Sequence, residues 1–274
     1  DVSLENVSLV DPFADPDRDK VVNAFYEKRK HKGMTPEEAE RTLMDNHVYY
    51  GAAMVRLEMA DGFVAGASHT TGDVARAGIF CLDIDRGIGT VSSSFLMEMP
   101  DPSFGEDGLL AYGDCGIIPY PSARQLAGIA IATSDLFGKL FDVEPRVAML
   151  SYSTHGSASG DSIDTIRQAL EKIRDKRPGL MVDGEIQVDA ALVPDIASRK
   201  CPESPVAGKA NVLIFPNLDA GNISYKLTQR LGNARAVGPI MQGLKKPCSD
   251  LSRGCSWEDV VDTAVVTAVR AQGA

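Results

Sequence analysis

Along the whole chain, short apolar runs alternate with longer amphipathic segments. This alternation is typical of strands separated by helices, and it favours a layered α/β fold. We expect helices over residues 19–32, 47–59, 122–141, 161–176, 188–199, 219–231 and 257–271, with another starting after Thr35. We expect strands over residues 63–65, 88–97, 109–112, 146–152, 179–182, 212–215 and 236–240.

Three polar loops follow strand-like runs, at residues 66–72, 153–160 and 246–256. Ligands of open α/β sheets bind beyond the carboxyl ends of the strands. The three loops are therefore expected to form the functional site.

The loop at 246–256 carries the strongest chemical signal. Ser252 and Arg253 precede the last helix, and Asp259 lies in its first turn. Free N–H groups at a helix N-terminus attract anions, and a guanidinium adds a planar pair of donors. The spacing of Ser256 and Asp259 equally fits a capping box, in which the carboxylate is structural. The spacing alone does not separate these two interpretations.

Two further basic features have a functional and a structural interpretation. Residues 28–32 form a cluster that either grips a phosphorylated ligand or ends a solvated helix, and composition favours the helix end. The loop 66–72 leads into a helix with Arg76, so it either cradles an anion or is a surface connection.

A group of carboxylates also has two interpretations. Asp183, Glu185 and Asp189 either bind a metal or form ion pairs, and the ion pairs are favoured.

Bulk composition narrows the class of partner. The net charge is −10, which argues against nucleic acid or an anionic membrane as the main partner. No run approaches the roughly 20 apolar residues of a membrane-spanning helix. The five cysteines are scattered without a CxxC pair, and the four histidines show no ligand spacing. We expect reduced thiols, a cytoplasmic enzyme and no bound metal.

Several longer segments carry a family resemblance. These segments are residues 23–33, 149–154, 183–191, 204–212, 215–223 and 250–256, and they match one family in its own order. On these segments, the chain strongly resembles the phosphate acetyltransferase (phosphotransacetylase) family, also described as acetyl/butyryl phosphotransferases.

The resemblance implies the reaction acetyl-CoA + phosphate ⇌ acetyl phosphate + CoA, with CoA and acetyl-CoA as substrates and no separate cofactor. It implies two three-layer α/β domains similar to those of isocitrate and isopropylmalate dehydrogenases, with the site in the cleft between them. The first domain would comprise residues 1–86 and 230–274, and the second residues 87–229. A homodimer is implied as well.

The resemblance also implies residue roles. Asp259 matches the proposed base for the CoA thiol, Arg253 the arginine at the acyl phosphate, and Ser252 the neighbouring hydroxyl. Arg29 and Arg76 match arginines associated with binding CoA or phosphate. We expect direct attack of the thiolate on acetyl phosphate in a ternary complex. Cys255 is the alternative, as a covalent nucleophile.

The chain departs from the family pattern at Ser249, where asparagine is usual, and at His155, where lysine is common. Members also carry an earlier stretch of roughly fifty residues, one or two strand–helix units. Without those strands, the sheet of the first domain is expected to have an open edge. Two other functions stay open: phosphate butyryltransferase, and a non-catalytic acetyl-CoA-binding module like the C-terminal region of some malic enzymes.

Overall fold

The computed structural model describes residues 5–272. Its strands are β1 (Phe63–Ala65), β2 (Ser92–Glu98), β3 (Leu109–Gly113), β4 (Arg146–Leu150), β5 (Met181–Ile186), β6 (Val212–Ile214), β7 (Arg235–Gln242) and β8 (Cys248–Asp250). Its helices are α1 (Arg18–Arg29), the short 3-10 helix η1 (Lys30–Lys32), α2 (Pro36–Asp45), α3 (His47–Arg56), α4 (Thr71–Leu82), α5 (Ala123–Phe141), α6 (Asp161–Lys176), α7 (Val188–Leu192), α8 (Pro194–Lys200), α9 (Leu218–Leu231) and α10 (Trp257–Ala271).

Within the described residues, all eight strands join one sheet in the order β1-β8-β7-β2-β3-β6-β4-β5. Strands β1 and β8 are parallel, and β7 pairs with β8 and β2 in the antiparallel sense. The strands β3, β6, β4 and β5 are parallel to one another and antiparallel to β2. β1 and β4 therefore run in opposite directions. The α/β class is confirmed, and β1 forms one edge of the sheet among the residues described.

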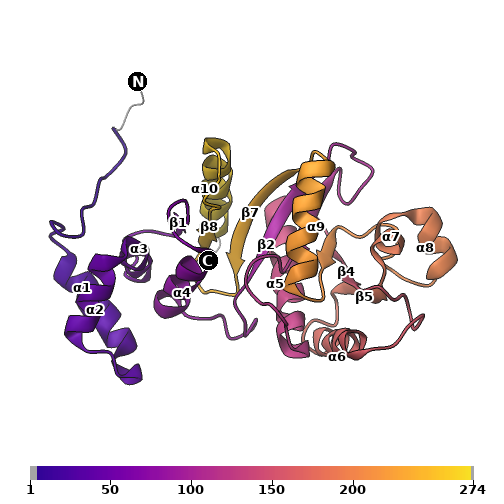
Figure 1. Ribbon diagram of the computed structural model, residues 1–274, viewed down its shortest axis with the longest axis horizontal. Helices are drawn as coiled ribbons and strands as arrows, with labels where there is room; N and C mark the ends of the chain where they lie inside the picture. The colour runs from indigo at the N-terminus through magenta and orange to yellow at the C-terminus, as the bar shows by residue number, and fades with distance from the viewer. Residues whose placement is uncertain (1–4, 273–274) are drawn as a thin grey trace.

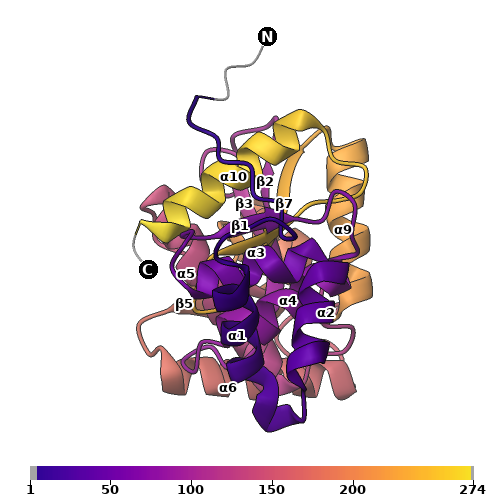
Figure 2. The ribbon, with the colours of Figure 1, turned by 90° about the vertical axis from the view of Figure 1, so that its left-hand side faces the viewer.

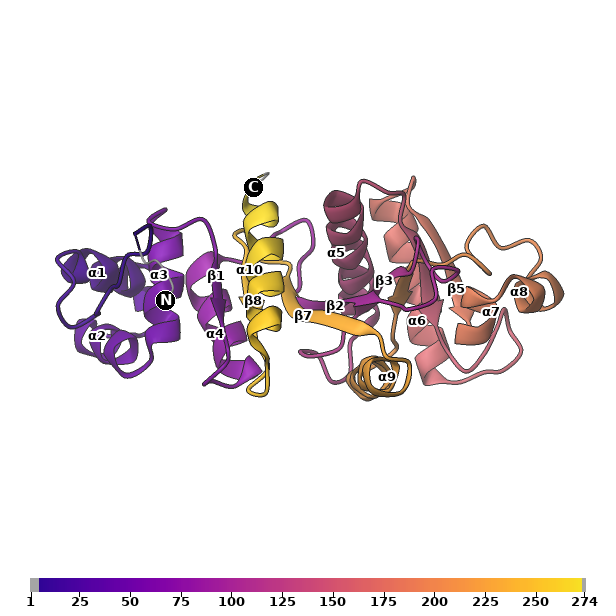
Figure 3. The same cartoon turned by 90° about the horizontal axis from the view of Figure 1, so that it is seen from above.

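Helices cover both faces of this sheet. Helices α1 to α4 gather at the end near β1, and α7 and α8 lie at the other end (Figure 1). Helices α5 and α9 stand on opposite sides of β2, β3 and β7 (Figures 2 and 3). Burial of apolar side chains against the sheet, at about 25 cal/mol per Å², is the main force that holds these layers together.

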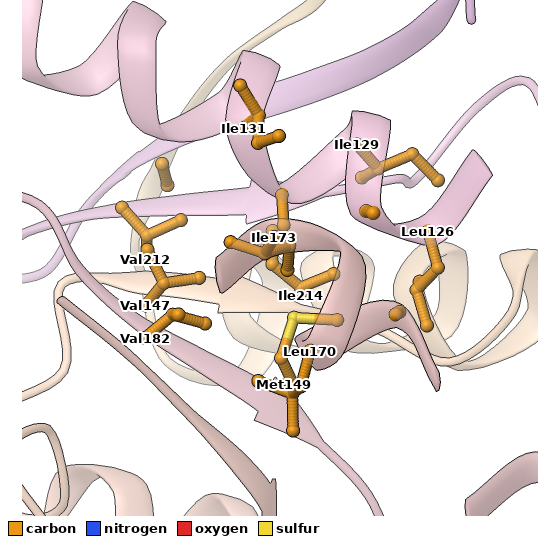
Figure 4. Close-up of a cluster of buried hydrophobic side chains, with 14 of the residues drawn as sticks. Leu126, Ile129, Ile131, Val147, Met149, Leu170, Ile173, Val182, Val212 and Ile214 are labelled. Carbon is orange, nitrogen blue, oxygen red and sulfur yellow. The ribbon is translucent and has the colours of Figure 1, made fainter. Parts of the chain in front are cut away.

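The largest core cluster lies between α5, α6 and one face of the sheet (Figure 4). Ile129 of α5, Ile173 of α6 and Met149 of β4 are fully buried in it. A second cluster joins α1, α2, α3 and α4 to Met241 and Cys248, and a third packs α7, α8 and α9 against the other sheet face.

Several helix ends form as their sequences predict. Thr35 and Glu38 make the expected capping box at α2, with Pro36 in the first helical position. Gly33 ends the preceding helical segment with φ of 87°, a left-handed conformation that costs glycine little. Helices α6 and α10 have the predicted bounds of 161–176 and 257–271.

The largest differences from the prediction concern three elements. The helix expected at 188–199 is broken into α7 and α8, because Val193 is extended and Pro194 has no N–H to continue the first helix. Strand β5 extends to Ile186 and so contains Asp183 and Glu185. The loop expected at 246–256 contains β8, whose three residues pair with β1 and β7. Unlike the equally short β1 and β6, this strand contains a serine and an aspartate, so no apolar run marks it in the sequence.

Within residues 5–272, none of the helices combines the length and the apolar character that crossing a bilayer requires.

Candidate active site

A cavity of about 450 Å³ lies between α9, the start of α4 and the segment that joins β8 to α10. We call it the candidate active site. Ser252, Arg253 and Asp259 all line it, together with Cys255. The structure therefore brings together the three residues that the sequence singled out near the last helix.

The path of the chain through β8 sets the position of these residues. Asp250 is the register partner of Ala65 in the parallel pair β1–β8, and the Leu251 N–H donates to the Ala65 carbonyl over 2.7 Å. The Cys255 N–H then donates to the Ser252 carbonyl over 3.0 Å, which closes a tight turn. The turn presents Ser252 and Arg253 at the carboxyl end of β8, directly before α10.

Asp259 has the geometry of a capping residue. Its Oδ2 accepts a hydrogen bond from the Ser256 N–H at 2.8 Å, and the Ser256 Oγ accepts one from the Asp259 N–H at 3.2 Å. The capping box predicted from the spacing is confirmed. Among the described residues Oδ1 of Asp259 has no hydrogen bond, so the cap holds the side chain in place and leaves one oxygen available.

Arg253 and Ser252 are exposed at the cavity. Across residues 5–272 the Arg253 guanidinium makes no hydrogen bond or ion pair, and the Ser252 Oγ accepts only the Gly254 N–H, at 3.3 Å. Both groups are adjacent to the N-terminus of α10, where N–H groups and the helix dipole favour negative charge. The arrangement suits an anionic ligand.

Sequence reasoning missed a buried carboxylate in the same site. Asp250 lines the cavity but is fully buried, and its Oδ2 accepts a hydrogen bond of 2.5 Å from the Thr71 hydroxyl at the start of α4. Its Oδ1 is buried without a hydrogen-bond partner. Burial raises the pKa of Asp250 to about 6, against the opposing effects of the Thr71 hydroxyl and the Leu251 amide. No sequence pattern shows which aspartate of a loop becomes buried.

A basic wall on α9 was also missed. Lys226 and Arg230 line the cavity four residues apart, and Tyr225 beside them stacks on Phe95 of β2 with ring centroids 3.9 Å apart. Asn222, one turn earlier, donates to the Cys115 carbonyl over 3.0 Å. The i, i+4 spacing of these polar residues was visible in the sequence, but it does not distinguish a ligand-facing side from a solvated one.

Arg29 and Arg76 do not line this cavity. The Arg29 guanidinium lies 3.8 Å from the ring centroid of Phe80, and its Nε is buried without a hydrogen bond. Arg76 is exposed and pairs with Asp73 at 3.3 Å. Phe80 contacts Tyr49, whose pKa is raised by burial and lowered in part by the nearby Arg76. The two arginines therefore belong to one cluster on α1, α3 and α4, beside the candidate active site.

The loop at 153–160 is absent from this site, and the expectation that it contributes was wrong. It follows β4, which runs antiparallel to β1 and β8, so its polar groups lie at the opposite edge of the sheet. There the buried Glu185 accepts hydrogen bonds from Arg167, the Gly156 N–H and the Ser153 hydroxyl. Burial acts to raise the pKa of Glu185, but these bonds outweigh it and lower the pKa to about 2.

Two of the carboxylates at 183–189 thus form ion pairs, as the sequence favoured: Glu185 with Arg167, and Asp189 with Lys200 at 2.8 Å. Asp183 Oδ2 lies within hydrogen-bond distance of His155 Nε2, at 3.2 Å. In the part of the chain that the structure describes, no group of three side chains is placed to hold a metal ion. All five cysteines are free, and Cys255 is the half-buried one.

Comparison with known proteins shows which family the chain belongs to. A sequence model of the phosphate acetyl/butaryl transferase family matches residues 1–268. The chain belongs to this family. It is 48% identical over 271 residues to the phosphate acetyltransferase of Thermoanaerobacterium thermosaccharolyticum, covering 99% of this chain and 82% of that protein. It is 43% identical over 270 residues to the Bacillus subtilis phosphate acetyltransferase, covering 98% and 81%.

Solved structures agree with the family. A phosphotransacetylase from Streptococcus pyogenes superposes with a TM-score of 0.89 and 42% identity, over 99% of this chain and 82% of that one. A 4-hydroxythreonine-4-phosphate dehydrogenase from Klebsiella pneumoniae superposes with a TM-score of 0.52 at 12% identity, over 85% of this chain and 72% of that one. The second likeness concerns the fold alone.

Proposed function

We propose that this chain transfers an acetyl group between CoA and inorganic phosphate, the reaction of the phosphate acetyltransferases that it resembles. One observation of the structure carries the proposal. Arg253 and Ser252 lie without tertiary partners beside the capped carboxylate of Asp259, in a cavity whose other wall is the basic face of α9. That wall supplies positive charge for anionic substrates, and the carboxylate supplies a proton acceptor.

The reaction proceeds by direct attack in a ternary complex. The S–H proton of CoA passes to Asp259, and the thiolate sulfur forms a bond to the carbonyl carbon of acetyl phosphate. The bond from that carbon to the phosphate oxygen then breaks, and the departing phosphate takes up a proton. Arg253, Ser252 and the N–H groups at the start of α10 stabilise the negative charge on the oxygens. Cys255 is not needed as a nucleophile in this scheme.

Arg29 and Arg76 are assigned to binding of CoA. They lie outside the lining of the candidate active site, so they suit the distant phosphate groups of CoA better than the reacting phosphate. Arg29 is half-buried, and its Nε is buried without a hydrogen bond among the described residues. Arg76 is exposed and would exchange its ion pair with Asp73 for a phosphate group of CoA.

The two-domain arrangement is part of the proposal. Residues 1–86 with 230–274 form one half and residues 87–229 the other, in the manner of isocitrate and isopropylmalate dehydrogenases. The candidate active site has α9 of the second half on one side and the β8–α10 segment of the first half on the other. Because β2 and β7 pair along most of their length, they join the halves and serve as the hinge.

We further propose a homodimer in the cytoplasm that needs no cofactor beyond its substrates. Tyr152, Val188 and Leu227 are large exposed apolar side chains around one cavity of about 410 Å³, and such a surface favours a protein partner. The five free thiols suit a reducing compartment. The acidic net charge of −10 disfavours nucleic acid.

The test is release of the CoA thiol from acetyl-CoA in the presence of phosphate, measured with a thiol reagent on the full chain. Arg253→Lys keeps the charge but loses the planar fork, and we expect about a 100- to 1,000-fold lower kcat. The fold should be unaffected, because Arg253 has no partner among the described residues. An inactive wild-type chain that still binds acetyl-CoA would support the non-catalytic module instead. A preference for butyryl-CoA would support the butyryltransferase.

A further inference from the structure

A second cavity, of about 580 Å³, opens on the face of the sheet that carries α5 and α10. We call it the α5–α10 cavity. It lies among α5, the end of α6, the segment 85–88 before β2, the turn 242–247 after β7, and Arg270 of α10. None of the residues that line it lines the candidate active site, which is on the α9 face of the same strands. Figures 2 and 3 show α5 and α9 on these opposite faces.

This cavity is strongly basic within an acidic protein. Two carboxylates line it, Asp85 and Asp135. The basic residues that line it are Arg86, Lys139, Lys176, Arg177, Lys245, Lys246 and Arg270. An excess of cations around one open cavity raises the local concentration of anions, even when the net charge of the chain is negative.

Most of these cations lack a carboxylate partner. Arg177 pairs with Asp135 at 2.7 Å, and Lys246 pairs with Glu58 at 3.6 Å. Lys139 donates to the Arg270 carbonyl over 3.1 Å, and the Arg270 guanidinium donates to the Cys248 carbonyl over 3.1 Å. Burial lowers the pKa of Arg270 to about 10, because removing the guanidinium from water disfavours its charged form. An anion in the cavity would compensate that cost.

The remaining cations are less constrained still. Among the residues that the structure describes, the Lys176 ammonium reaches only the Gly87 carbonyl, at 3.5 Å. Neither Lys245 nor Arg86 has a side-chain hydrogen bond or ion pair anywhere in residues 5–272. These donors are free to bind a ligand that carries more than one negative charge.

A buried side-chain amide indicates that the ligand carries a hydroxyl group. Gln242 lines the cavity and is 2% exposed, and its amide N donates to the Ser92 and Thr133 hydroxyls over 3.0 and 2.8 Å. Its Oε1 is buried without a partner. A hydroxyl both donates and accepts, so a ligand hydroxyl would satisfy this amide in either orientation. The walls also include Ile131, Leu136 and Leu244, which suit a carbon skeleton rather than a bare ion.

We propose that the α5–α10 cavity is a regulatory site for a small organic polyanion that carries a hydroxyl group. Lys139 and Lys176 come from the half of the chain at 87–229, whereas Lys245 and Arg270 come from the half at 230–274. A bound polyanion draws these cations together across the hinge strands. The halves then tilt apart on the α9 face, so the KM for acetyl-CoA rises. This regulatory effect rests on the proposed function, whereas the binding does not.

The test of binding is calorimetric titration of the full chain with citrate, which has three carboxylates and a hydroxyl. Saturating CoA and phosphate, which cannot react with each other, are present to fill the candidate active site. Lys139→Glu and Lys245→Glu should each weaken citrate binding about 10-fold or more. The control Lys172→Glu makes the same charge change at an exposed position of α6 outside the cavity, and it should bind like the wild type. Tricarballylate, which lacks the hydroxyl, should bind the wild type several-fold more weakly.

The outcomes separate the two proposals. No binding of citrate to the wild type at millimolar concentration, or equal binding to all three variants, would overturn the site. Binding that disappears in Arg253→Ala would also overturn it, since the ion would then occupy the candidate active site. If citrate binds at the cavity, the KM for acetyl-CoA should rise about 5-fold or more, and an unchanged KM would refute the regulatory role. An inactive chain that binds citrate would contradict the proposed function alone.

Discussion

Two carboxylates of the candidate active site differ in their surroundings. Asp259 is half-buried, and one of its oxygens accepts the Ser256 N–H while the other is without a partner among the described residues. Asp250 is fully buried against Gly66 and accepts the Thr71 hydroxyl. We propose that the first exchanges a proton with a substrate. The second joins the end of β8 to the start of α4, so we assign it a positioning role.

Asp259→Asn tests the proton acceptor. The amide oxygen of asparagine still accepts the Ser256 N–H, so the cap and the free energy of unfolding should change by less than about 1 kcal/mol. The amide cannot take the thiol proton, and kcat should fall about 100- to 10,000-fold. Steady-state kinetics and urea unfolding measure the two effects. Turnover close to that of the wild type would remove Asp259 from the mechanism.

Asp250→Asn tests the buried carboxylate through pH. Because its pKa in the folded state is about 6, above the usual 3.8, Asp250 favours folding while protonated. That contribution is present below about pH 4 and is lost as the pH rises through 6, a difference of about 3 kcal/mol. Asparagine has no such proton, so the stability of the variant relative to the wild type should rise by about this amount between pH 4 and pH 7.

Urea unfolding at several pH values measures this difference. The exposed carboxylate of Asp175 on α6 provides the control, and Asp175→Asn should follow the wild-type curve within about 0.5 kcal/mol. Parallel curves for Asp250→Asn and the wild type would show that the Asp250 carboxylate is not perturbed by burial.

At the scale of the elements, the site depends on how closely β1 approaches β8. Gly66 follows β1 with φ of 119°, and it packs directly against Asp250 and Leu251. A Cβ at Gly66 would overlap Oδ1 of Asp250 and lie 2.5 Å from the Leu251 carbonyl oxygen. The backbone at Gly66 therefore sets where the segment with Ser252 and Arg253 begins.

Gly66→Ala should lower both the stability of the fold and the turnover. The strained φ and the overlap with Leu251 should lower the free energy of unfolding by about 3 kcal/mol. The shift of the β8–α10 segment should lower kcat as well. Gly72→Ala in α4 is the matched control, because a Cβ there meets nothing closer than the Thr70 Oγ at 3.6 Å. Thermal unfolding and turnover should be near wild type in the control, and equal effects in the two variants would argue against this role for Gly66.

At the scale of the whole molecule, one sheet with reversed strand directions separates the polar loops. β1 and β8 bring the loops at 66–72 and 251–256 to one site, and β4 takes the loop at 153–160 to the opposite edge. The surface also has exposed apolar side chains on α9, among them Ile223, Leu227 and Leu231. Such a face is where the proposed homodimer would bury area.

Leu227→Lys tests that interface. Leu227 is 51% exposed, so a lysine should leave the monomer fold intact while placing a charge in the apolar contact. Light scattering of the full chain should show the mass of one chain for this variant and of two chains for the wild type. Val265→Lys changes a similarly exposed residue on α10, 57% exposed, and should stay dimeric. A monomeric wild type would rule out the dimer.

Local signals in the sequence predicted most of the helices, and they singled out the segment before α10 as the candidate site. The capping residues Thr35 and Ser256 contact residues only three or four positions away, so the helix starts that they form can be predicted from the sequence alone. The same holds for the alternation of strands and helices. The candidate site residues near α10 were proposed from the sequence because they are close to one helix N-terminus and because their motif matches a family.

The amino-acid sequence by itself determined the α/β class, the capped start of α10 and the grouping of Ser252, Arg253 and Asp259. Only the tertiary structure decided which loops meet, that Asp250 is buried, and that Lys226 and Arg230 face the same cavity. The physical reason is that capping and periodicity depend on neighbours in the chain. Strand direction, burial and the set of charges around a cavity depend on residues far apart in sequence. The hydrogen bond between Thr71 and Asp250, 179 positions apart, is an example.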